Sequence, residues 1–104
     1  PLAYVVAFGD EDAPRAAALA GSMRRGGVAT VVSTDSQQGL GQQLRSADQL
    51  GCRWALIEGS DEQARAEVSV KDLRTGQQQA VVRSTLADWL QASAASAVTD
   101  EAAR

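Results

Sequence analysis

Apolar and polar positions along the chain follow two periods, one typical of buried strands and one typical of amphipathic helices. Residues 3–8 form an almost unbroken apolar run that ends at Gly9, which predicts a strand buried on both faces. Residues 28–33, rich in β-branched side chains, and residues 53–58 predict two more strands. Between these runs apolar residues recur at helical spacing, which predicts two helices. Their expected core-facing positions are Ala16, Leu19, Ala20 and Met23 in the first, and Leu40, Leu44 and Ala47 in the second.

Local signals mark where these elements begin and end. Asp12 precedes Pro14, and an aspartate cap followed by a proline in the first turn is typical of a helix start. Gly26 and Gly27 end that helix, since glycine adopts the left-handed conformation at little cost. After a polar loop over residues 34–39, the second helix is expected over residues 40–50.

The last third of the chain predicts a hairpin followed by a helix. Residues 67–71 alternate between apolar and polar, residues 74–77 form a turn, and residues 78–83 return as a strand. Ser84 or Thr85 can cap a final helix that carries Leu86, Trp89 and Leu90. We therefore expect one folded domain over residues 1–94 and a flexible tail over residues 95–104.

The connections between strands predict the topology. Two strand–helix–strand crossovers make the first three strands parallel, with right-handed connections. The segment between Glu58 and Ala66 is too short for an ordinary crossover helix, so the fourth strand should run antiparallel. The predicted fold class is α/β, a three-layer α/β/α arrangement with a five-stranded mixed sheet in the order 2-1-3-4-5.

Composition restricts the function. Thirteen acidic and ten basic residues give a net charge of −3, which argues against non-specific binding of duplex nucleic acid. A lone Cys52 allows no internal disulfide, and no apolar run is long enough to cross a membrane. The chain opens with Pro1 and enters a strand almost at once, which favours a fragment cut at a domain boundary.

Three motifs suggest chemistry but have simpler explanations. Residues 9–12, Gly-Asp-Glu-Asp, could hold Mg²⁺ at the carboxyl end of the first strand, yet helix capping explains these acids better. Residues 39–41, Gly-Leu-Gly, lack the lysine and hydroxyl residue of a phosphate-binding loop. Cys52 has no histidine anywhere in the chain to act as its base, so it is interpreted as a packing residue.

The second helix carries a polar face that suits recognition. At about 100° per residue, four side chains fall within one narrow arc: Gln38, Gln42, Arg45 and Gln49. This arc could be an ordinary solvated face. Its amide and guanidinium groups are also suited to the edges of unpaired bases.

Several segments resemble one protein family in the same order and with the same spacing. Residues 36–51, SQQGLGQQLRSADQLG, are similar to the rSLgkQlkyAdklGa segment of histidyl-tRNA synthetases. Residues 54–62 (WALIEGSDE) resemble their strand followed by iGedE, and residues 68–77 (VSVKDLRTGQ) resemble their vtvKdL.tGeQ hairpin. The first strand and its closing glycine, residues 4–9, agree as well. The resemblance covers about residues 3–90 and is to the C-terminal anticodon-binding domain of these class II synthetases.

The resemblance implies a non-catalytic domain that binds the anticodon stem-loop of tRNA. The family's contact positions fall on Gln37, Gln42, Arg45, Glu62 and Lys71. It implies no cofactor and no metal in this chain, because ATP and Mg²⁺ would belong to an upstream catalytic domain of a histidine–tRNA ligase. That parent protein is expected to be cytoplasmic and homodimeric, with no membrane association.

Two departures from the family pattern keep a second hypothesis open. Gln42 and Gln43 stand where the family usually has at least one lysine, and Gly39 replaces a larger or basic residue. The chain could therefore be an interaction or regulatory module that keeps the fold without reading tRNA. An independent enzyme is the third choice, because no acid–base pair or nucleophile is visible.

Overall fold

The computed structural model, which describes residues 2–35 and 37–102, contains a single five-stranded sheet in the order β2-β1-β3-β4-β5. The strands are β1 (Ala3–Val5), β2 (Thr30–Val32), β3 (Trp54–Ile57), β4 (Glu67–Asp72) and β5 (Gln78–Val82). β1 pairs parallel with both β2 and β3, and β4 pairs antiparallel with both β3 and β5. The predicted strand order and the antiparallel fourth strand are therefore confirmed.

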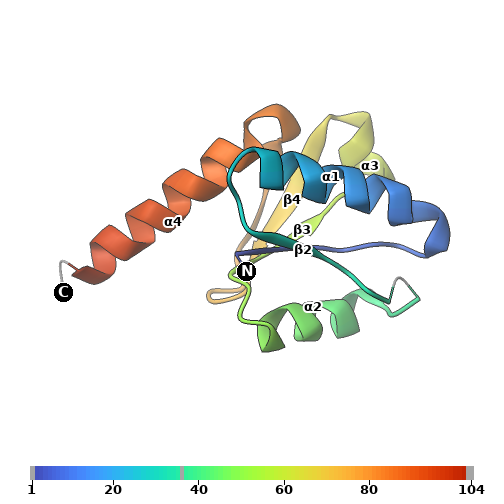
Figure 1. The fold of residues 1–104 in the computed structure, drawn as a ribbon, viewed down its shortest axis with the longest axis horizontal. Coiled ribbons are helices and arrows are strands. Elements are labelled where there is room, and N and C mark those ends of the chain that lie inside the picture. Colours follow the sequence, from blue (N-terminus) through green and yellow to red (C-terminus); the bar gives the residue numbers. More distant parts are fainter. Residues whose placement is uncertain (1, 36, 103–104) are drawn as a thin grey trace.

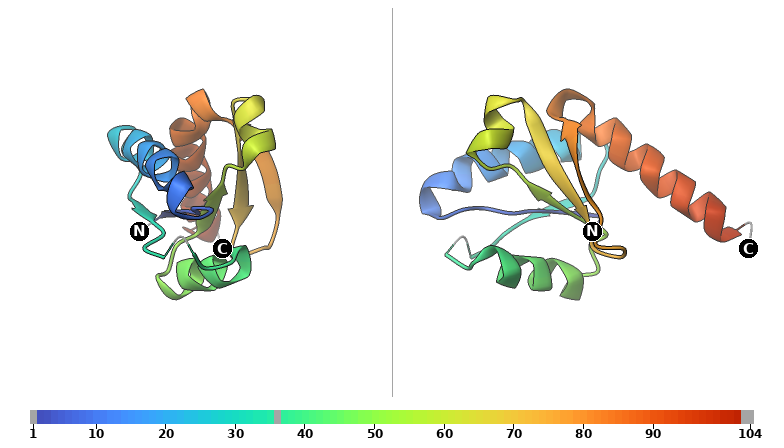
Figure 2. Two further views of the ribbon diagram at one scale, coloured as in Figure 1. Left: turned by 90° about the vertical axis from the view of Figure 1, so that its right-hand side faces the viewer. Right: turned by 180° about the vertical axis from the view of Figure 1, so that it is seen from behind.

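Helices cover both faces of the sheet (Figure 1). The α-helices are α1 (Ala13–Arg25), α2 (Leu40–Gln49), α3 (Ser60–Ala64) and α4 (Leu86–Ala102), and short 3-10 turns at Asp10–Asp12 and Arg83–Thr85 precede α1 and α4. Figure 2 shows α1 and α4 on one side of the sheet and α2 on the other. The five-residue α3 was not predicted, because a single helical turn leaves almost no periodic signal.

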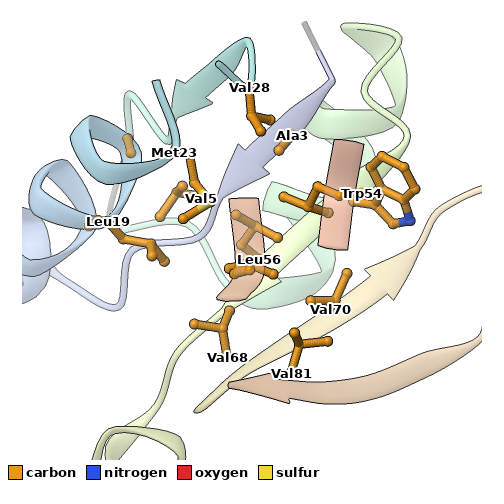
Figure 3. Close-up of a cluster of buried hydrophobic side chains, with 14 of the residues drawn as sticks. Ala3, Val5, Leu19, Met23, Val28, Trp54, Leu56, Val68, Val70 and Val81 are labelled. Atoms are coloured by element: carbon orange, nitrogen blue, oxygen red, sulfur yellow. The ribbon is translucent and has the colours of Figure 1, made fainter. Parts of the chain in front are cut away.

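The core consists of two unequal clusters, one on each face of the sheet. The larger lies beneath α1 and α4 and contains Val5, Leu19, Trp54, Leu56 and Val68 among its fifteen buried residues. Figure 3 shows these side chains converging from α1 and the strands. The smaller cluster lies beneath α2 and is built from Tyr4, Val6, Ala47, Cys52 and Ile57. The α2 face therefore has much less apolar material to hold its helix in place.

The two glycines that end α1 also allow α4 to pack closely. A Cβ on Gly26 would lie only 2.6 Å from the Cβ of Ala87, and Gly27 has a φ of +89°. The side-chain amide of Gln91 donates a hydrogen bond of 2.8 Å to the carbonyl of Gly26. The glycine pair thus ends α1 and lets the first turns of α4 pack closely against it.

The end of α4 extends away from the rest of the molecule (Figure 1). The helix continues to Ala102, and residues 103 and 104 lie outside the described part of the chain. The flexibility expected of residues 95–104 stays a prediction. None of the described helices combines the length and apolar character needed to cross a membrane.

Candidate functional site

The exposed face of α2 carries a preformed pair of polar side chains. The Nη2 of Arg45 donates a hydrogen bond of 2.7 Å to Oε1 of Gln42, and both side chains are exposed. The bond joins positions i and i+3, which are neighbours on a helix surface. Within the described part of the chain, the Gln42 amide N–H groups and the remaining guanidinium N–H groups have no other side-chain partner, so they stay available to a ligand. These two predicted site residues therefore form one hydrogen-bonding unit.

The buried face of α2 differs from the sequence prediction. Leu40 is 40% exposed, whereas Gln43 is completely buried. The Gln43 amide accepts a hydrogen bond of 3.1 Å from the backbone N–H of Ala7 and donates one of 2.8 Å to the carbonyl of Ala7. It also donates to the carbonyl of Gln38 at 2.8 Å. A helical pattern based on apolar residues alone could not find Gln43, because its partners are main-chain groups distant in sequence.

Gln37 lies in the loop between β2 and α2, where side-chain hydrogen bonds hold Asp35, Gln37 and Gln38. The backbone N–H of Gln37 donates a hydrogen bond of 3.1 Å to the carboxylate of Asp35. The Ser33 hydroxyl donates to the carbonyl of Asp35 at 3.2 Å, and Gln43 holds the far end of the loop at Gln38. The side chain of Gln37 is exposed. Gln37 is thus presented three residues before α2 begins at Leu40.

Lys71 shares a face of the sheet with α2. It lies opposite Ala55 of β3 and Gln78 of β5. Val68 and Val70 of the same strand belong to the core beneath α1 and α4, and alternate residues of a strand point to opposite faces. Lys71 and Ser69 therefore point to the α2 side, where Ser69 Oγ accepts a 2.7 Å hydrogen bond from the Gln78 amide.

Glu62 lies on a different element from the other four predicted positions. It belongs to α3, which follows the carboxyl end of β3, and its side chain is partly exposed. Lys71, in contrast, pairs with Ala55 near the beginning of β3. The structure therefore places Gln37, Gln42 and Arg45 on the segment formed by α2 and the loop before it. Lys71 lies on the face of the sheet that α2 covers. Within the described part of the chain neither Glu62 nor Lys71 forms a salt bridge.

An ionic network that the sequence did not predict ties together the carboxyl ends of β1 and β3. Glu58 is 1% exposed, and its carboxylate pairs with Arg15 at 2.9 Å and also with Arg83. Arg15 in turn donates to both carboxylate oxygens of Asp12 and to the carbonyl of Val6. Three chain segments thus meet at one buried carboxylate. No local pattern marks Glu58, since its partners come from α1 and from the turn before α4.

Asp12 occupies the N-cap position of α1, as predicted, but its side chain has another role. Its side chain makes no capping hydrogen bond to α1; instead it accepts one of 2.8 Å from the backbone N–H of Phe8. The hydrogen bonds from Arg15 hold the pKa of Asp12 below its ordinary value, although burial acts in the opposite direction. The same pairing raises the pKa of Arg15. Asp12 therefore fixes the backbone that leaves β1.

Neither of the remaining chemical motifs gains a reactive neighbour. Burial raises the pKa of Cys52, which packs with Tyr4 and Ala47 in the smaller core, as the sequence predicted. No group of three or more cysteine, aspartate and glutamate side chains among residues 2–35 and 37–102 is placed to hold a metal ion. The candidate chemistry of the described residues is therefore recognition through the hydrogen-bonding and charged side chains around α2.

Comparison with protein families decides the relationship of this chain. The family described as anticodon binding domain matches residues 3–93. The chain belongs to the anticodon-binding domain family. This result confirms the resemblance identified in the sequence.

The relatives of this anticodon-binding domain include bacterial histidine–tRNA ligases. That of Parasynechococcus marenigrum is 42% identical over 74 residues, which are 71% of this chain and 17% of the ligase. That of Bacillus velezensis is 33% identical over 89 residues, which are 86% of this chain and 21% of the ligase. The chain therefore spans about a fifth of the length of the ligases that it matches.

Solved structures show the same fold. Histidyl-tRNA synthetase from Nostoc matches with a TM-score of 0.79 and 31% identity, over 86% of this chain and 21% of that chain. The RNA binding domain of threonyl-tRNA synthetase from Cryptosporidium parvum matches with a TM-score of 0.77 over 88% of this chain and 23% of that one. At 15% identity the second likeness concerns the fold alone. The binding roles of the five predicted residues stay predictions.

Proposed function

We propose that this anticodon-binding domain reads the anticodon loop of histidine tRNA as part of a histidine–tRNA ligase. The observation that carries the proposal is identity of 31–42% to histidine–tRNA ligases across most of the domain. Aminoacylation, with its ATP and Mg²⁺, would then take place in another part of the longer, cytoplasmic and homodimeric protein. This chain would supply recognition only.

The arrangement around α2 suits unpaired bases. Single-stranded loops expose base edges that accept and donate hydrogen bonds, so recognition does not require a strongly basic protein. The Gln42–Arg45 pair supplies several N–H donors in a fixed orientation. Gln37 supplies an amide from the preceding loop, and Lys71 supplies a positive charge on the same side of the sheet. Glu62, on α3, would accept hydrogen bonds from a base amino group.

The test compares stem-loops bound by the isolated chain. We expect it to bind a stem-loop with the histidine anticodon more tightly than one with an altered anticodon. Arg45→Ala should weaken binding of the first by about 1–3 kcal/mol, as removing a base contact does. Arg25→Ala is the matched control, because Arg25 is an exposed arginine in the last turn of α1, on the opposite face of the sheet.

The outcome also decides between the two hypotheses. Equal affinity for both stem-loops at moderate salt, or equal effects of the two arginine substitutions, would contradict anticodon reading by α2. Hydrogen–deuterium exchange adds a second measure. If residues 37–45 gain no protection when the stem-loop is added, the chain is an interaction module that retains the fold without reading tRNA.

A further inference from the structure

A shallow crevice of about 470 Å³ opens between the carboxyl ends of β1 and β3. None of the five proposed contact residues lines it, although the carboxylate of Glu62 lies close to its wall at Gly59. Its walls come from the segment after β1 and from α3, and its lining includes Phe8, Glu11, Asp12, Glu58, Ser60 and Gln63. The strand order reverses between these two strands, since β1 connects to β2 on one side and β2 connects back to β3 on the other. Open α/β sheets bind ligands at such a point. We refer to this site as the Phe8 crevice.

Phe8 is an exposed aromatic ring on a rigid support. It is 46% exposed, which is unusual for the only phenylalanine of a small domain. Its backbone N–H is held by Asp12, and Asp12 is itself held by two nitrogens of Arg15. The ring therefore stands on a fixed backbone at the edge of the crevice. An exposed aromatic ring on a rigid backbone is suited to stacking on a planar ligand.

The polar groups of the crevice favour a ligand that donates hydrogen bonds. Asp12 and Glu58 are neutralised by arginines, as described above. Glu11 is exposed and forms no ion pair with any residue that the structure describes, so its carboxylate can accept hydrogen bonds. The exposed Ser60 hydroxyl can donate or accept. The Gln63 amide nitrogen already donates to the carbonyl of Glu58 at 3.4 Å, which leaves its oxygen and its second N–H for a ligand. None of the described residues that line the crevice is cationic, which disfavours a phosphate group within it. A planar ligand with an amino group meets both conditions.

We propose that the Phe8 crevice holds one unpaired RNA base that carries an exocyclic amino group, stacked on the Phe8 ring with its amino group donating to Glu11. This proposal rests on the proposed function and extends it, because the crevice shares α3 with Glu62. The bound base would be one that the loop turns outward beyond the surface of α2. Phe8 and Glu11 then contribute to the choice of tRNA.

Because the chain contains a single phenylalanine, fluorine NMR can test this contact directly. Incorporation of para-fluorophenylalanine labels position 8 alone, and the histidine-anticodon stem-loop is then added to saturation. We expect the Phe8 signal to shift, and the shift to disappear when one particular loop nucleotide is made abasic. An unchanged signal in the saturated complex means that the ring contacts no base, and overturns the proposal.

Affinity measurements provide the second test. Phe8→Ala should weaken binding at least about 5-fold, the lower end of the contribution from one stacked base. Phe8→Tyr should retain binding because it keeps the ring. Leu50→Ala is the matched control, because Leu50 is an apolar side chain of similar exposure, at 53%, at the end of α2. If Phe8→Ala binds as tightly as Leu50→Ala, the proposal is wrong.

A base analogue tests the amino group. Replacing the responsible nucleotide by the analogue that lacks the amino group should weaken binding by the wild type but not by Glu11→Gln. Equal losses in both proteins would overturn the role of Glu11.

The two proposals fail in different ways. Loss of anticodon discrimination contradicts the proposed function, whereas retained discrimination with an unmoved Phe8 signal contradicts only the crevice.

Discussion

The buried carboxylate of Glu58 holds together the chain segments at the carboxyl ends of β1 and β3. Glu58 forms ion pairs with both Arg15 and Arg83 and has almost no solvent access. These ion pairs matter mainly because breaking them is unfavourable. If one partner is removed, the other keeps a charge in a partly buried position with nothing to compensate it. The same network supports Asp12 and, through it, the backbone of Phe8.

Replacement of Glu58 should therefore destabilise the domain strongly. We expect Glu58→Leu to lower the free energy of unfolding by about 3 kcal/mol, because Arg15 and Arg83 lose their shared carboxylate. Urea denaturation followed by circular dichroism measures the effect. Glu67→Gln is the matched control, because it breaks a pair with the exposed Arg65 and should leave the unfolding midpoint unchanged. Equal midpoints for the two variants would contradict a stabilising role of the network.

Asp12 should make stability depend on acid pH. Its pKa in the folded protein lies below the ordinary value of 3.8, so its contribution is complete above pH 3.8 and is lost as the pH falls through the folded pKa. Asp12→Asn should lower the free energy of unfolding by about 1–2 kcal/mol at neutral pH. The difference from the wild type should then shrink below about pH 4. A difference that stays constant in denaturation curves from pH 7 down to pH 2 would contradict this role.

At the scale of elements, α2 depends on one buried amide. Among the described residues, the smaller core contains five buried apolar side chains, and Leu40 does not join them. Gln43 compensates by hydrogen bonding both main-chain groups of Ala7 and the loop at Gln38. One side chain thus positions the helix against β1 and also holds the loop that carries Gln37.

Loss of this amide should be costly even when its volume is kept. Gln43→Met should lower the free energy of unfolding by about 2–3 kcal/mol, because the buried N–H and C=O of Ala7 would lose their partner. Gln42→Ala, on the exposed face of the same helix, should change it by no more than about 0.5 kcal/mol. Chemical denaturation provides both values. A Gln43→Met protein as stable as the wild type would contradict the hydrogen-bonding argument.

At the scale of the whole molecule, a net charge of −3 limits how much RNA affinity can come from counterion release. Only two of the five proposed contact residues are basic, namely Arg45 and Lys71. Recognition by hydrogen bonds and stacking, with few phosphate contacts, is the mode that fits this balance.

The affinity for the stem-loop should therefore respond weakly to salt. With two cationic contacts, the logarithm of the binding constant should fall with a slope of about −1.4 against the logarithm of the salt concentration. A fourfold increase in salt would then weaken binding about 7-fold. Lys71→Ala should make the slope shallower by about 0.7, the contribution of one cationic contact. Fluorescence anisotropy at several salt concentrations tests both values, and a slope steeper than about −4 would contradict them.

The order of the elements and the sheet topology could be predicted from the sequence because both depend on short-range information. Apolar periodicity identified the five strands and three of the four α-helices, and crossover rules then allowed few arrangements. The polar face of α2 could also be predicted, since residues three or four apart lie together on any helix. The family resemblance followed from the same local motifs.

Tertiary structure alone decided which side chains are anchored and which are free. Gln43 is buried because two main-chain groups at Ala7, 36 residues away, satisfy its amide. Glu58 is buried because arginines from two other segments reach it, and Phe8 is exposed because the chain leaves the sheet after β1. Residue type determines what each of these groups can bond to. Only the folded arrangement determines whether a distant partner, or solvent, lies within reach.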